Sequence, residues 1–287
     1  MTNVVAAPPT LSDRPAPRLV ARASTILLTG TLLLIALAVT APGILTGASP
    51  TAVDPSGVLA APSGSHWWGT DQLGRDVCAR VLYGARASLL LGVGSVALAV
   101  GIGAALGLAA ALGGRLVDLV LTRVMDVLIA IPPLMLALLV IAVLGPGSGR
   151  TMIATVVALT PLYGRLLRAE AMVARRAGYV EAARGLGVGR MALVVRHVLP
   201  NALGPALALA TTGVGSAIVY VAGLSFLGLG PQPSTAQWGL MLAEGRDFLR
   251  SAWWVGVCPG AALALTVLAF QAAGRRAQQR LVRRDVG

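Results

Sequence analysis

The sequence predicts an all-α bundle of about six membrane-spanning helices, with both ends of the chain in the cytoplasm. Three observations lead to this fold class: an apolar composition, six long apolar runs and an uneven distribution of arginine. Of the 287 residues, 56% are hydrophobic and only 12% are charged, and the mean hydropathy is +0.80. Soluble domains average about 25% charged residues. Aromatic residues make up only 4%, so small and aliphatic side chains dominate, as they do in closely packed membrane helices.

A helix needs about 20 mostly apolar residues to cross the hydrocarbon core of a bilayer. The third predicted run contains Pro132 and Pro133, and the fourth, which is the shortest, contains Pro161. Proline breaks helices in water, but neighbouring helices in a membrane bundle can satisfy the freed backbone groups. A cleaved signal peptide is the alternative for the first run, although that run is long for one. The six predicted spans are 24–41, 87–112, 127–144, 152–167, 203–229 and 253–273.

The arginines orient these spans. Every basic residue is arginine, and the formal net charge is +12, a balance that also occurs in nucleic-acid-binding proteins. Here the arginines lie between apolar runs, so membrane topology explains them and nucleic acid is not an expected partner. With the N-terminus in the cytoplasm, 17 of the 23 arginines lie inside and six outside, as the positive-inside rule requires. The predicted parts are a cytoplasmic tail 1–23, a first span 24–41, an extracytoplasmic loop 42–86, a five-helix core 87–273 and a basic cytoplasmic tail 274–287.

The longest cytoplasmic loop, 164–202, is strongly basic and also strongly patterned. Residues 168–176 are predicted to be helical, and Gly185, Gly187 and Gly189 to break the helix. A second short helix should follow, with an apolar face, and Pro200 should end it before the fifth span. A solvated basic loop is the alternative, but such a loop needs no turn and no apolar face. The pattern favours a docking element for a cytoplasmic partner. The predicted apolar face consists of Met191, Val194, Val195 and Val198.

This loop also contains a spaced motif, Glu181-Ala182-Ala183 followed by Gly187 and Leu199-Pro200. The motif resembles the EAA loop of binding-protein-dependent ABC permeases. Residues 196–201 resemble the form found in the dipeptide/oligopeptide/nickel branch of that family. Three further stretches resemble the C-type permease subunit of this branch, and each falls on the expected side of the membrane. They are HWWGTDQLGRDV at 66–77, LSFLGLG at 224–230 and QWGLMLAEGR at 237–246.

The chain departs from the family pattern at His197, where the general pattern has an apolar residue, at Trp67-Trp68, and at two further places. Many relatives have a glutamate just ahead of the Leu-Ser-Phe-Leu-Gly stretch, where this chain has Val221-Ala222-Gly223. The usual acidic tail after the last span is here the basic Gly274-Arg275-Arg276. These departures leave the predicted fold unchanged, but fine details of coupling and of substrate do not carry over.

The resemblance implies a permease subunit of a type I ABC importer in the bacterial cytoplasmic (inner) membrane, forming half of a pore for peptides or related small solutes. It implies a heterodimer with a second homologous permease, two ATP-binding cassette subunits, an extracytoplasmic solute-binding protein and surrounding membrane lipid. Residues 181–190 would be the coupling helix, with Glu181 as the first choice for a charged contact. The ATPase-coupling loop comprises Glu181, Ala182, Ala183, Gly187, Arg190, His197, Leu199 and Pro200.

The residue types exclude several kinds of chemistry. Without lysine the chain cannot form an ordinary Walker A site, which needs a lysine at the nucleotide's terminal phosphates. ATP and magnesium are therefore expected on partner ATPase subunits, and this chain is expected to be no enzyme and to hold no cofactor. His66 and His197 are far apart in the sequence, so no metal site is expected. Gly103 and Gly107 are expected to form a helix-packing face.

The alternative function is an ion-driven secondary transporter. Such a protein would need inverted repeats or charged residues near the middle of the membrane, and the apolar runs show neither. Arg123 and Asp126 could form a proton relay, but their spacing of three favours a pair at a helix end. The runs show only small and apolar residues, so the sequence alone assigns no substrate-lining residue.

Overall fold

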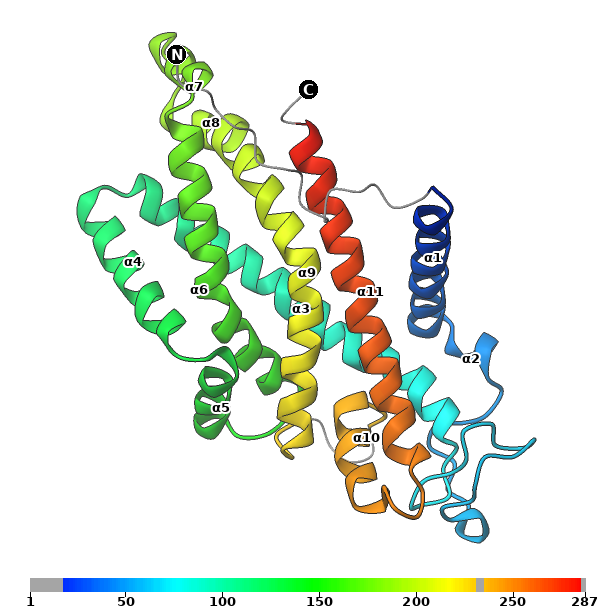
Figure 1. Cartoon of the computed structure of the whole chain (residues 1–287). Coiled ribbons are helices and arrows are strands. Elements are labelled where there is room, and N and C mark those ends of the chain that lie inside the picture. The colour runs from blue at the N-terminus through cyan, green and yellow to red at the C-terminus, as the bar shows by residue number, and fades with distance from the viewer. Residues whose placement is uncertain (1–17, 231–234, 285–287) are drawn as a thin grey trace, which may run out of the picture.

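The computed structural model describes residues 18–230 and 235–284, and within these ranges the chain is helical, with turns and one isolated β-bridge. Figure 1 shows long helices running side by side. A short 3-10 helix spans Pro55–Gly57, another spans Arg246–Phe248, and a π-helical turn spans Val194–Val198. The α-helices are α1 Arg18–Thr40, α2 Pro42–Leu45, α3 Val77–Leu112, α4 Arg115–Ala130, α5 Pro133–Leu144, α6 Ser148–Arg175, α7 Gly178–Gly185, α8 Arg190–Leu193, α9 Leu199–Phe226, α10 Trp238–Gly245 and α11 Trp254–Arg284.

Four helices (α3, α6, α9 and α11) are long and apolar enough to cross a membrane, and α4 and α5 together can form a fifth span. The first predicted span falls in α1. Its apolar part, Ser24–Thr40, has 17 residues, which is the lower end of the range for a spanning helix. The helical membrane bundle is confirmed, whereas the sixth crossing stays a prediction.

The third predicted span, 127–144, is wrong as a single helix. The chain forms α4 and α5 instead, bent by 98° at a break between Ala130 and Pro133. Ile131 is extended, with φ −87° and ψ 129°, because the residue before a proline is pushed out of the helical region. Pro132 has ψ 132° for the same reason, and α5 starts with Pro133. The two consecutive prolines therefore divide this span into two helices.

Pro161 shows the contrasting outcome. It lies buried inside α6, and the helix continues through it to Arg175. The Thr160 hydroxyl donates a hydrogen bond of 2.7 Å to the Val156 carbonyl, so a side chain bonds the backbone beside the proline. The fourth predicted span, 152–167, is thus part of a 28-residue helix. The helix predicted at 168–176 is confirmed as its continuation up to Arg175.

Helix α3 is also longer than the predicted span 87–112. It begins at Val77, because the Asp76 carboxylate accepts a hydrogen bond of 2.7 Å from the Ala79 amide and caps the helix. This is the ordinary N-cap arrangement. The non-helical part of the predicted loop 42–86 therefore ends at Asp76. A helix of 36 residues is about 54 Å long, much more than the hydrocarbon thickness of a bilayer.

Helices α3 and α6 cross at Gly103, Gly107 and Gly164. A Cβ atom placed on Gly103 would lie 2.8 Å from the Tyr163 Cβ and 2.9 Å from the Gly164 amide nitrogen. One placed on Gly107 would lie 2.5 Å from the Gly164 carbonyl oxygen. Only glycine permits this approach, so the predicted packing face is confirmed. The main apolar core surrounds this contact, with Val96, Ala99, Tyr163, Ala217 and Ile218 among its buried members.

The bundle has two distinct ends (Figure 1). The start of α1 and the end of α11 lie at the end that holds α7 and α8, which we call the α7 end. Helices α2 and α10 lie at the opposite end, called the α10 end. The described ends of the chain are thus on the same side, as an even number of crossings requires.

Candidate functional site

The predicted helix–turn–helix is present at the α7 end. Helix α7 ends at Gly185, and Gly187 follows with φ +82°. The Leu186 amide donates to the Ala182 carbonyl at 3.0 Å, and the Val188 amide to the Ala183 carbonyl at 3.1 Å. The second bond, with a left-handed residue just before its donor, is the Schellman arrangement that closes many helices. Gly187 is therefore needed for the shape of the turn.

The tip of this element presents small and apolar groups to the outside. Ala182, Gly185 and Gly187 are exposed, and Ala183 is half-buried. Leu186, which the sequence analysis did not single out, is 86% exposed. The leucine stands alone between two glycines, so the tip offers one large apolar side chain on an otherwise small-residue surface. Glu181, Arg190 and His197 lie on helical backbone, but their side chains fall outside the described part of the structure.

The second half of the element differs from the prediction. Helix α8 continues into the π-helical turn and directly into α9, with a bond from the Leu199 amide to the Val194 carbonyl. Pro200 does not end a helix: it lies in the first turn of α9, directly after the π-helical turn, and the helix continues through it. Leu199 is half-buried and Pro200 is exposed.

The π-helical turn also changes the apolar face. Val198 is buried, but Val195 is 53% exposed, so the predicted face is wrong at that position. The side chain of Met191 is outside the described part, and Val194 is half-buried. Leu193, five residues before Val198, is buried in its place, because a π-helical turn brings residues i and i+5 to one side.

The element rests on the ends of three long helices. Val198 packs with Ala111 of α3 and with Ala171 and Ala174 of α6. The Arg175 guanidinium donates a 2.7 Å hydrogen bond to the Ala111 carbonyl near the end of α3. A cavity of about 450 Å³ lies beneath, lined by Leu112, Arg175, Val180, Val188, Leu193, Val194 and Val198. A force on α7 would therefore reach α3, α6 and α9.

Two ion pairs join α4 to α6. Arg168 binds Asp118 through two hydrogen bonds, one of 2.8 Å between Nη2 and Oδ2. Asp126 pairs with Arg165 at 3.1 Å, whereas the sequence analysis favoured Arg123. The helical spacing of three was the only signal available, and the true partner comes from a different helix. These contacts explain the acidic residues of this segment without a proton relay.

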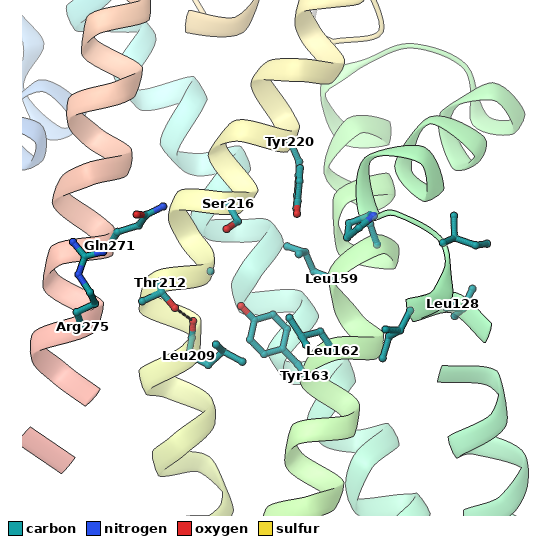
Figure 2. Close-up of a pocket in the computed structure, with 15 residues that line it drawn as sticks. Leu128, Leu159, Leu162, Tyr163, Leu209, Thr212, Ser216, Tyr220, Gln271 and Arg275 are labelled. Atoms are coloured by element: carbon teal, nitrogen blue, oxygen red, sulfur yellow. Dashed lines mark hydrogen bonds between the residues drawn. The ribbon is translucent and has the colours of Figure 1, made fainter. Parts of the chain in front are cut away.

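A groove of about 350 Å³ opens on α9, between the α4–α5 break and α11. Figure 2 shows Thr212, Ser216 and Tyr220 along α9, with Gln271 and Arg275 of α11 on one side and Leu128 on the other. The groove was not predicted from the sequence, since its polar residues are scattered over separate apolar runs and, for Arg275, the basic tail that follows the last run. Only the packing of α6, α9 and α11 brings them together.

The α10 end holds a buried cluster of four charges. Arg75 Nε lies 2.7 Å from Asp71 Oδ2, and Arg80 Nη1 bonds both Asp71 and, at 2.9 Å, Glu244 Oε2. Asp71 is 0% and Arg80 1% exposed in their side chains. Glu244 comes from α10 and the other three from residues 71–80, so the cluster joins the family-like stretches 66–77 and 237–246. Both stretches are recognisable in the sequence, but their contact is not, since they lie more than 150 residues apart.

Tryptophans reinforce that junction. The Trp238 indole N–H donates to the Val81 carbonyl at 2.9 Å, and the Trp254 indole N–H to the Thr70 carbonyl at 3.1 Å. Nearby, Asp54 caps the 3-10 helix Pro55–Gly57. Hydrogen bonds from the Ser56 hydroxyl and amide hold the pKa of the Asp54 carboxyl below its usual value. The loop before α3 is thus fixed to α10 and α11.

Comparisons with known proteins agree with this architecture. The family model of the binding-protein-dependent transport system inner membrane component matches residues 100–284. The dipeptide transport system permease protein DppC of Alkalihalophilus pseudofirmus is 40% identical, covering 84% of this chain and 79% of the relative. The di/tripeptide transport system permease protein DppC of Pseudomonas aeruginosa is 44% identical, covering 72% of this chain and 68% of the relative. The glutathione transport system permease protein GsiD of Pectobacterium atrosepticum is 37% identical, covering 85% and 81%.

Solved structures show the same fold. The inward-facing methionine ABC transporter MetNI matches with a TM-score of 0.56 at 18% identity, covering 69% of this chain and 94% of the matched chain. An amino acid ABC transporter solved with histidines matches with a TM-score of 0.51 at 19% identity, covering 70% and 94%. Family and relatives favour an ABC permease over an ion-driven secondary transporter. The chain therefore belongs to the binding-protein-dependent transport system inner membrane components and is a permease subunit of an ABC importer.

Proposed function

We propose that this permease imports peptides or closely related small solutes across a bacterial cytoplasmic (inner) membrane. Its relatives, which are named as permeases for dipeptides, di/tripeptides and glutathione, support this substrate class. The chain forms half of the pore, and a second homologous permease forms the other half. Two ATPase subunits bind ATP and magnesium, and an extracytoplasmic protein delivers the solute. The α7 end faces the cytoplasm, in agreement with the arginine distribution.

The observation that carries the coupling role is the anchoring of the α7–α8 element. Its tip is exposed at Ala182 and Leu186, whereas its base packs on α3 and α6 through Val198. An exposed helix with small residues can lie in a groove of a partner protein. Mechanical coupling requires a tip that binds the ATPase and a base that is fixed to the spanning helices. The contact residues are those of the predicted coupling loop, with Leu186 added.

The experiment is co-purification of the ATPase with variants of the tip. Leu186→Asp places a charge at the centre of the proposed contact and disturbs no packing, because Leu186 is 86% exposed. We expect at least about a tenfold loss of bound ATPase, since a charge buried without a partner is costly at an interface. Val173→Asp on α6, where the side chain is 70% exposed, is the matched control and should bind normally. Equal binding by both variants would contradict the docking role.

A further inference from the structure

The groove on α9 has a polar wall without partners. The hydroxyls of Ser216 and Tyr220, the Gln271 amide and the Arg275 guanidinium have no hydrogen-bond or ion-pair partner within the described residues. Thr212 differs, because its hydroxyl donates to the Leu209 carbonyl at 2.8 Å. Polar groups facing hydrocarbon are strongly disfavoured. Ser216, Tyr220 and Gln271 lie within predicted spans and Arg275 just past the last one, so water or a polar solute is expected in the groove when the protein is in a membrane.

The opposite wall is apolar and includes the broken span. Leu128 and Ile129 of α4 line it, together with Ile131 and Pro133 at the 98° bend and Leu162 of α6. Irregular backbone at membrane depth is tolerated only where it is buried in protein or lines a water-filled cavity. The break at the groove fits either case, and the unpartnered groups on the facing wall favour the water-filled cavity.

The two walls together define the chemistry of an occupant. Arg275 is a fixed positive charge whose planar guanidinium can bind a carboxylate through two parallel hydrogen bonds. Gln271, Ser216 and Tyr220 offer both donors and acceptors, as a peptide amide requires. The apolar wall suits uncharged side chains. A volume of about 350 Å³ falls within the range of small-molecule sites.

We propose that this groove is a contact site for the transported solute within this one subunit, with Arg275 binding its carboxylate. Gln271, Ser216 and Tyr220 contact its amide groups, and the wall at Leu128 and Ile131 contacts its apolar side chains. The inference rests on the peptide import proposed above and adds to it named solute-contacting residues. The competing occupant, a helix of the second permease, is an outcome of the test.

The first measurement compares two neighbouring arginines on α11. Arg275 lines the groove. Arg276 does not line it and instead donates a 3.0 Å hydrogen bond to Ser24 on α1. Uptake of labelled L-alanyl-L-alanine and ATP hydrolysis are measured for the complete transporter in liposomes. We expect Arg275→Gln to lower uptake about tenfold or more, with ATP hydrolysis retained and with partial recovery in Arg275→Lys. Arg276→Gln should remain near wild type. Equal effects of Arg275→Gln and Arg276→Gln on uptake would overturn the proposal.

The second measurement tests the cavity directly, independently of folding defects at Arg275. Ser216→Cys is introduced after Cys78 and Cys258 are replaced by serine, and the assembled complex is treated with a charged, water-soluble thiol reagent. Leu265→Cys on α11, where the side chain is 60% exposed and lines a separate apolar groove against α1 and α3, is the matched control. We expect Ser216→Cys to react with the reagent, and millimolar L-alanyl-L-alanine to slow this reaction several-fold. Leu265→Cys should stay unreactive.

The other outcomes contradict the proposal in distinct ways. If assembly of the complex alone protects Ser216→Cys from the reagent, or if this cysteine cross-links to the second permease, the groove is part of the interface between the two permeases. A cysteine unreactive even in the isolated chain would show a dry, closed groove. If the wild-type complex imports no peptide, the proposed function fails, yet the reaction of Ser216→Cys still reports whether the groove is aqueous.

Discussion

Gly187 closes the turn at the tip of the molecule, and its φ of +82° is a conformation that side chains with a Cβ rarely adopt. The space around it is open, since a Cβ atom would meet nothing within 4 Å. Glycine is therefore required at position 187 for its backbone conformation, and not because a larger side chain would lack space. This separates the shape of the turn from direct contact with a partner.

Substitutions at Gly187 should follow backbone preference. Gly187→Ala should destabilise the turn by about 1 kcal/mol and reduce the ATP hydrolysis coupled to transport, whereas Gly187→Asn, which tolerates the left-handed region, should retain most of it. Gly185→Ala is the control, because its neighbourhood is also open and its φ is not positive. ATP hydrolysis by the reconstituted transporter is the measurement. Equal activity of Gly187→Ala and Gly187→Asn would show that the turn tolerates other backbone shapes.

The charge cluster at the α10 end depends on each of its members. Glu244→Gln removes one of two negative charges that face Arg75 and Arg80. An uncompensated buried charge costs about 3 kcal/mol or more, and Arg80 Nη2 already lacks a partner within the described chain. We expect a clear drop in the thermal unfolding temperature in detergent. Asp247→Asn, in an exposed pair with Arg246, should change nothing, and equal melting of the two variants would contradict the account.

Among the helices, α3 and α6 approach each other closely through glycines. Gly103→Ala places a methyl group 2.8 Å from the Tyr163 Cβ and 2.9 Å from the Gly164 nitrogen. The two backbones must separate, at a cost of about 1–3 kcal/mol. Gly101→Ala on the same helix meets nothing within 4 Å and serves as control. Thermal unfolding in detergent should distinguish the two, and unchanged stability in Gly103→Ala would mean that the helices are less tightly packed.

Helix existence could be predicted from the sequence, because each apolar run is a local property. Breaks were harder to predict, since a single Pro161 is absorbed within α6 whereas the Pro132-Pro133 pair splits a span. The difference depends on neighbouring bonds such as that of Thr160 with Val156. The turn at Gly187 was predictable from glycine alone. The face of the following helix was not, because the π-helical turn at Val194–Val198 shifts its register.

The candidate sites divide in the same way. The coupling loop could be found from sequence, because its motif is contiguous and its residues lie on one short element. The polar groove could not, because Tyr163, Ser216 and Gln271 come from three helices and each looks isolated in its own run. The cluster of Asp71 with Glu244 joins residues far apart in the chain. Contacts of this kind follow from packing and not from local pattern.

At the scale of the whole molecule, the features lie in order along the bundle. The α10 end carries the charge cluster and the fixed loop, the groove opens on α9 within the bundle, and the α7 end carries the exposed tip (Figure 1). Helix α3 begins at the charge cluster and ends beneath the tip, whereas α6 and α9 line the groove and reach the α7 end. A displacement at the tip can therefore reach the groove through continuous helices, as coupling between a motor and a pore requires.

The most direct test of this account is cross-linking from the tip to the ATPase. Ala182→Cys at the exposed tip and Ser63→Cys in the exposed loop at the α10 end are each placed in a chain whose Cys78 and Cys258 are serine. The active complex is treated with a short thiol-reactive cross-linker. The account predicts a link between Ala182→Cys and the ATPase subunit, and none from Ser63→Cys. Failure of Ala182→Cys to link in an active complex, or a link from Ser63→Cys to the ATPase, would contradict it.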